Sequence, residues 1–159
     1  MIDEATVIQK IRQFDKKHGN DGINLNGWLL FSNGARREQN PWGRLCEPPT
    51  DLYFRSKLQV RYWSELTRKA LDEFDELKHQ LVSGANAAMA QGFPGPDSRF
   101  LDQLRQLANA AKACQSSLEE AQKQLTANTP EEVSLREQQD AWNRQRNQSI
   151  LDELMSIQV

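Results

Sequence analysis

The sequence predicts an all-α fold: an elongated antiparallel helical bundle, or coiled-coil hairpin, with three long helices and a short N-terminal helix. Apolar residues recur at alternating spacings of three and four over residues 104–125, which is the seam of a heptad pattern. Two compact groups of turn residues divide the second half of the chain into helix-length segments. Only 38% of the 159 residues are hydrophobic and the mean hydropathy is -0.76, which favours narrow apolar stripes. We therefore expect a single helical domain over residues 1–159.

The first element expected is a short helix over residues 3–17. Val7, Ile8, Ile11 and Phe14 fall on one face of that helix. This apolar face predicts that the helix docks against the longer helices as a fourth, short member of the bundle.

A long irregular loop is expected over residues 18–50, because turn-forming residues begin and end it. Loops of this length in small domains are usually functional, inserted or ordered on binding. The apolar residues 28–31 precede Asn33 and Gly34, a pair that tolerates positive φ. One short β-hairpin is therefore the only strand structure predicted within the loop.

Two long helices are expected over residues 51–91 and 97–127, folded back on each other. Residues 92–96 cannot continue a helix, and Asp97 or Ser98 can cap the next one. Their predicted seams consist of Trp63, Leu66, Ala70, Phe74, Leu77, Leu81, Gly84 and Ala88 on the first, and Leu104, Leu107, Ala111, Cys114, Leu118, Ala121 and Leu125 on the second. In this pairing large side chains are expected to meet small ones repeatedly, with Leu81 opposite Ala108 and Trp63 near Leu125.

A third long helix is expected over residues 130–156. Thr129 fits its N-cap, Pro130 its first position and Glu132 the reciprocal place of a capping box. A second reversal of the chain would place Trp142 near Cys114 and complete a three-helix bundle. The apolar residues near its end equally fit a homodimer; they are Leu151, Leu154 and Ile157.

Aromatic and basic residues gather in one part of the chain. Seven of the twelve aromatic residues fall in residues 28–63, and residues 34–69 carry a net charge of +4 within an overall charge of -2. Arginine and tryptophan are frequent anchors of protein interfaces. The candidate partner-binding residues are Trp28, Phe31, Arg36, Arg37, Trp42 and Arg44. The same aromatic residues also fit a small core that pins the loop to the hairpin.

The leading hypothesis is a non-enzymatic protein-interaction or assembly subunit, which binds another protein through this loop and the adjoining helix end. An alternative is an accessory nucleic-acid-binding subunit that contacts phosphates through Arg55, Lys57, Arg61 and Arg68. Opposite charges four residues apart, such as Arg61 with Glu65 and Arg68 with Asp72, instead favour a self-paired helix surface. A third class, an enzyme, has no recognisable motif.

Several chemistries lack support in the sequence. The two cysteines lie far apart, and neither histidine has a neighbouring ligand pattern, so no metal site, cofactor or catalytic residue is predicted. The N-terminal region has no apolar run of the length that a signal peptide or membrane span requires. We expect a cytoplasmic protein that does not contact membranes.

Overall fold

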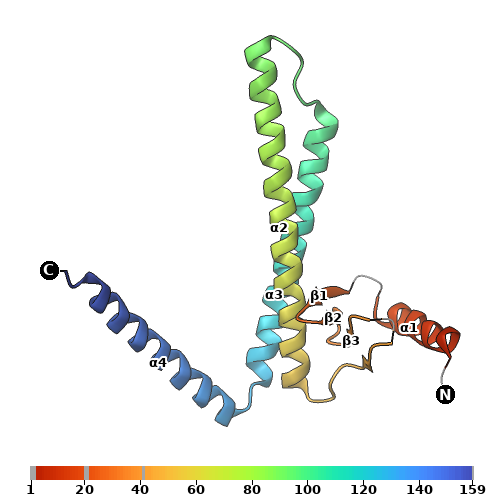
Figure 1. Cartoon of the computed structure of the whole chain (residues 1–159), viewed down its shortest axis with the longest axis vertical. Coiled ribbons are helices and arrows are strands. Elements are labelled where there is room, and N and C mark those ends of the chain that lie inside the picture. The colour runs from red at the N-terminus through yellow and green to blue at the C-terminus, as the bar shows by residue number, and fades with distance from the viewer. Residues whose placement is uncertain (1–2, 20–21, 41, 159) are drawn as a thin grey trace.

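The computed structural model describes residues 3–19, 22–40 and 42–158 (Figure 1). This part of the chain contains four helices and four strands. The helices are α1 (Glu4–His18), α2 (Leu52–Gln91), α3 (Ser98–Asn128) and α4 (Glu131–Ser156), and the strands are β1 (Ile23–Leu25), β2 (Trp28–Leu30), β3 (Arg36–Glu38) and β4 (Leu45–Cys46). The chain is mostly helical as expected, but it also contains a sheet that an all-α class omits.

A four-stranded antiparallel sheet occupies most of the segment expected to be an irregular loop. Its strands follow one another in the order β1-β2-β3-β4. Leu25 pairs with Trp28, so Asn26 and Gly27 alone connect β1 to β2. Both have positive φ, +50° and +84°, as a two-residue type I′ turn requires. The structure therefore has two more strands than the single predicted hairpin.

The hairpin that the sequence predicted is the one between β2 and β3. Phe31 N donates to Ala35 O at 3.0 Å, and Gly34 N donates to Phe31 O at 3.0 Å. Asn33 Oδ1 also accepts from Ala35 N at 2.9 Å. These bonds close the turn around Gly34, which has φ +88°.

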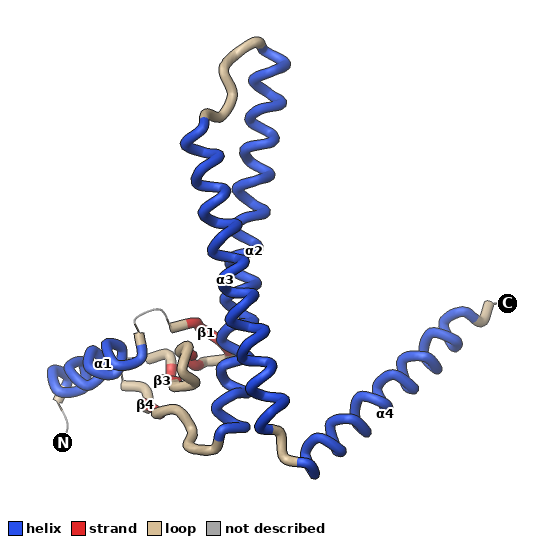
Figure 2. The backbone as a smooth tube through the Cα atoms, turned by 180° about the vertical axis from the view of Figure 1, so that it is seen from behind, coloured by secondary structure: helices blue, strands red, loops and turns tan. Residues whose placement is uncertain are grey.

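The sheet separates two small hydrophobic clusters, because alternate residues of a strand point to opposite faces. On one face Phe31 and Ala35 pack against Phe14 of α1. On the other face Ile23 and Leu30 pack against Tyr62 of α2. Helix α1 therefore docks on the sheet, with the sheet between it and the hairpin (Figures 1 and 2). The expected direct docking of this helix on the long helices is wrong.

Helices α2 and α3 form the predicted antiparallel hairpin. Asp51 and Asp97 cap their N-termini with side-chain oxygens, and Gly92 ends α2 in the left-handed conformation. All seven predicted seam residues of α3 are buried or half-buried. On α2 the predicted seam residues are half-buried except Gly84, which is exposed; its neighbour Ala85 is half-buried instead.

The pairing along the hairpin differs from the prediction by about one helical turn near its base. Trp63 lines a cavity with Ala121, and Leu125 lines another with Leu58. Trp63 thus lies beside a small residue, in line with close packing, whereas Leu125 lies beside another leucine.

Helix α4 does not complete a three-helix bundle. It leaves the base of the hairpin and extends away from it (Figure 2). Trp142 is 58% exposed and Leu154 is 61% exposed, so their predicted contacts with α3 are absent. The predicted capping box is also wrong, since Thr129 Oγ1 donates to Leu125 O at the end of α3 instead.

Candidate protein interaction surface

Strands β2 and β3 and the residue that precedes β4 bring together Trp28, Arg36 and Arg44. The guanidinium carbons of Arg36 and Arg44 lie 4.6 Å and 5.2 Å from the centre of the Trp28 ring. Trp28 also packs against the cluster around Tyr62. The Trp28 ring therefore packs against the core and also contacts two cations, an arrangement stabilised by cation–π attraction.

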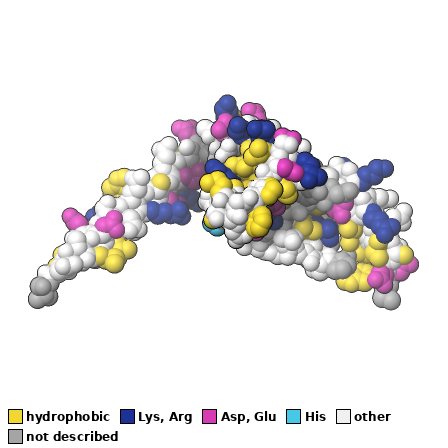
Figure 3. Space-filling view, turned by 90° about the horizontal axis from the view of Figure 1, so that it is seen from above, with side chains coloured by type: hydrophobic (Ala, Val, Ile, Leu, Met, Phe, Trp, Pro, Cys, Tyr) yellow, Lys and Arg dark blue, Asp and Glu magenta, His cyan; other side chains and the backbone are white. Residues whose placement is uncertain are grey.

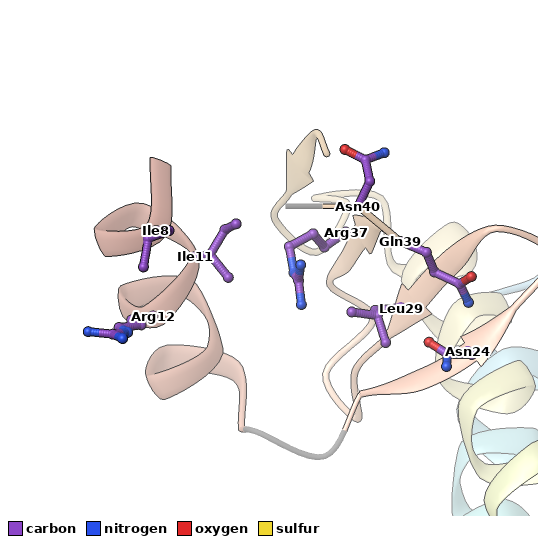
Figure 4. Close-up of a pocket in the computed structure, with 8 residues that line it drawn as sticks. All are labelled: Ile8, Ile11, Arg12, Asn24, Leu29, Arg37, Gln39 and Asn40. Atoms are coloured by element: carbon purple, nitrogen blue, oxygen red, sulfur yellow. The ribbon is translucent and has the colours of Figure 1, made fainter. Parts of the chain in front are cut away.

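A cavity of about 470 Å³ lies between α1 and the opposite face of the sheet (Figure 4). Ile8 and Ile11 face it from α1, and Leu29 and Arg37 face it from the strands. Arg37 Nε lies 3.8 Å from Asp15 Oδ1. This charge therefore has a partner within the chain.

The second and larger cavity, of about 760 Å³, lies beside the sheet at the base of the hairpin. Its wall has an apolar part made by the beginning of α2, the end of α3 and the segment before α2; this part comprises Pro49, Phe54, Leu58, Val60 and Leu125. Its polar part consists of Arg36, Lys57 and Arg61. We call this site the basic cavity.

None of the residues that line the basic cavity is acidic. Among the described residues, no ion pair involves Arg36, Lys57 or Arg61. Lys57 Nζ lies 5.0 Å from the centre of the Tyr53 ring, which is a contact with an aromatic face. The basic cavity therefore combines apolar surface with three cations that lack an anionic partner.

The other predicted phosphate contacts are engaged within the chain. Arg55 Nε donates to Pro49 O at 2.9 Å, and Arg68 pairs with Glu65 and with Asp72. Hydrogen bonds from Arg68 lower the pKa of Glu65 and raise the pKa of Arg68 itself. Glu65 thus pairs with Arg68 and not with Arg61, contrary to the spacing argument.

The structure separates the six predicted partner-binding residues into three groups. Phe31 is 2% exposed and Arg37 is largely covered, so both serve the interior. Trp28, Arg36 and Arg44 form the stack on the sheet. Trp42 is exposed in the connection between β3 and β4.

Phe54 is a residue of this surface that the sequence argument missed. It is 56% exposed and lines the basic cavity beside Lys57 and Arg61. The sequence signal for an exposed Phe54 is that two aromatic residues, Tyr53 and Phe54, are adjacent in the first turn of α2. Tyr53 is the buried one of the two. Adjacent residues of a helix point in directions about 100° apart, so only one of the two aromatic rings could enter the core.

His18 and Glu47 form a contact outside both cavities. His18 Nε2 lies 2.8 Å from Glu47 Oε2, and the other ring nitrogen contacts Asn33. Within the described part of the chain, no three His, Cys, Asp or Glu side chains converge to hold a metal ion. These contacts tie α1 to the segment that follows β4.

Comparison with protein-family models, curated proteins and solved structures finds no match to this chain. The described helices include none with the length and apolar character needed to cross a membrane. The basic cavity is therefore the feature of the chain from which a function is inferred.

Proposed function

We propose that the chain is a non-enzymatic protein-interaction subunit that binds a partner protein through the basic cavity. The segment of the partner that enters the cavity carries carboxylates and an apolar side chain. The observation that supports this most is the presence of three cations without carboxylate partners around an apolar wall. An acidic, partly apolar peptide segment complements both features.

The exposed Phe54 ring supports a protein partner. Aromatic and arginine side chains supply most of the energy at many interfaces, where they lie at the centre of the contact. Phe54 and Arg61 line the same cavity. A carboxylate that contacts Lys57 and Arg61 would gain charge-assisted hydrogen bonds in a partly desolvated setting.

Nucleic-acid binding is a second candidate, which the lack of acidic partners for Lys57 and Arg61 also favours. Phosphate-binding surfaces usually use longer rows of cations than three. Arg55 and Arg68, which would lengthen the row, already bind groups within the chain. We therefore place nucleic acid second.

The proposal is tested by a double charge reversal, Lys57→Glu with Arg61→Glu, at two exposed positions of α2. Proteins that copurify with the chain are identified by mass spectrometry, and the affinity of the purified partner is then measured by calorimetry. We expect the double reversal to weaken that affinity by about 100-fold, because two attractive contacts become repulsive.

The matched control is Arg105→Glu with Lys112→Glu, which makes the same change in charge at exposed positions of α3. It should bind the partner with the affinity of the unmodified chain. Equal binding by the two double variants would contradict the proposal. A salt-sensitive mobility shift of oligonucleotides, lost in the cavity variant only, would favour the nucleic-acid candidate.

A further inference from the structure

Helix α4 and its C-cap residue Ile157 present large apolar side chains that are exposed in the described chain. Leu135, Trp142, Ile150 and Ile157 are each at least 45% exposed. At about 100° per residue they fall within a sector about 80° wide. Figure 3 shows hydrophobic side chains on this arm, which stands clear of the rest of the molecule. We call this sector the α4 face.

The α4 face points away from the chain's own hairpin. Glu137 Oε1 accepts a hydrogen bond from Tyr53 Oη at 2.7 Å, which turns the Glu137 side of α4 toward α2. Glu137 lies about 180° around the helix from the middle of the α4 face. Closure of the face onto the chain's own α3 would require this hydrogen bond to break.

The spacing of the α4 face is symmetric about Arg146. Its four apolar residues follow one another at intervals of seven, eight and seven residues. If two copies of α4 pack antiparallel with Arg146 at the two-fold axis, Leu135 faces Ile157 and Trp142 faces Ile150. Each apolar side chain therefore meets an apolar side chain of the other copy, as a self-complementary two-fold contact requires.

Arg146 and Glu153 add charge complementarity to this arrangement. Both lie on the α4 face and line one groove of about 480 Å³ with Trp142 and Ile150. Helical side chains lean toward the N-terminus of their own helix, and the Arg146 guanidinium lies 5.7 Å from the centre of the Trp142 ring. In the antiparallel pair, the Arg146 side chain therefore extends toward Glu153 of the other copy. The Glu153 side chain of that copy extends toward Arg146 in turn.

We propose that two copies of the chain associate through antiparallel pairing of their α4 faces, with reciprocal ion pairs between Arg146 of one copy and Glu153 of the other. This contact uses a surface separate from the basic cavity, so it stands independently of the proposed partner protein. The two copies contribute identical residues. The hairpins then project from opposite ends of the paired helices.

The test is sedimentation equilibrium of the full chain with single and combined charge reversals. We expect Arg146→Glu and Glu153→Arg each to raise the dissociation constant of the dimer by about 10-fold or more, because each makes two like-charge contacts. We expect the double variant to restore the dimer. An equimolar mixture of the two single variants should also restore it as a heterodimer, since both ion pairs then have opposite charges.

Arg144→Glu is the matched control, because Arg144 is exposed on the side of α4 opposite the face. It should leave the dissociation constant unchanged, and circular dichroism should show that all variants keep their helix content. Three outcomes overturn the proposal: a monomer at every attainable concentration, a dimer insensitive to both single reversals, and single-reversal losses that neither combination restores. A monomer with Trp142 shielded from solvent would instead identify the chain's own hairpin as the occupant.

Discussion

Tyr53 at the start of α2 donates a hydrogen bond from Oη to Glu137 Oε1 of α4, over 2.7 Å and 84 positions of sequence. Tyr53 is 5% exposed, whereas its neighbour Phe54 is 56% exposed. The first turn of α2 therefore fixes the direction of α4 with one aromatic ring and lines the basic cavity with the next. The contact that orients α4 and the wall of the basic cavity therefore use adjacent residues at the hairpin base.

Replacement of Tyr53 by Phe should loosen α4 while the hairpin stays intact. The loss of one hydrogen bond should lower the free energy of unfolding by about 0.5–1.5 kcal/mol. Spin labels at Ser64 and Arg144, in a chain whose two cysteines are replaced, should show a broader distance distribution. An unchanged distribution would mean that other contacts set the direction of α4.

Replacement of Gly34 by Ala should destabilise the sheet. Gly34 has φ +88°, and an added Cβ would lie 3.2 Å from both Arg55 O and Arg55 Cγ. A strained backbone and a close contact together should cost about 1–3 kcal/mol in urea unfolding. Gly84→Ala is the control: its Cβ would meet only Pro96 at 3.9 Å, and it should stabilise α2 by about 0.5–1 kcal/mol.

Truncation of Phe31 should lower the stability of the chain far more than truncation of Trp42, although both are predicted partner-binding residues. Phe31 is 2% exposed and packs on Phe14, so Phe31→Ala should lower the free energy of unfolding by about 3–5 kcal/mol. Trp42→Ala should change it by less than about 0.5 kcal/mol. Equal losses of stability in thermal unfolding would contradict these assignments.

Cys114 should react slowly with alkylating reagents in the folded chain. Burial in the hairpin seam raises the pKa of its thiol. Because the folded-state pKa exceeds the unfolded value of about 8.5, stability should be fully present below that value and should decline as pH rises through the folded-state pKa. Cys114→Ala should remove this part of the alkaline decline. An iodoacetamide rate at pH 8 equal to that in urea would contradict the prediction.

Much of the fold was predictable because its signals are local. The α3 seam follows a heptad rhythm that no other element disturbs, and Asp51 and Asp97 cap their helices through residues two or three positions away. The β2–β3 turn likewise depends on Asn33 and Gly34. Asn26 and Gly27, flanked by Leu25 and Trp28, carry the same local hairpin signal.

The remainder depends on contacts that spacing does not reveal. The four apolar residues of the α4 face recur at seven and eight residues, without the alternating three and four of the hairpin seam. Among the predicted site residues, Arg37 forms an ion pair with Asp15, which is distant in the sequence. Glu65 forms its ion pair with Arg68, so it does not neutralise Arg61. Which cations stay available to a partner is therefore a property of the fold.

Binding of a partner protein by the basic cavity is tested most directly by site-specific photo-crosslinking in living cells. Benzoylphenylalanine replaces Phe54 at the cavity wall, with the same replacement of the exposed Phe93 at the hairpin tip as the control. We expect one protein species crosslinked from position 54 only, and its loss when Lys57 and Arg61 are reversed to Glu. Crosslinking of position 54 to nucleic acid, or protein crosslinks unaffected by the reversal, would contradict the claim.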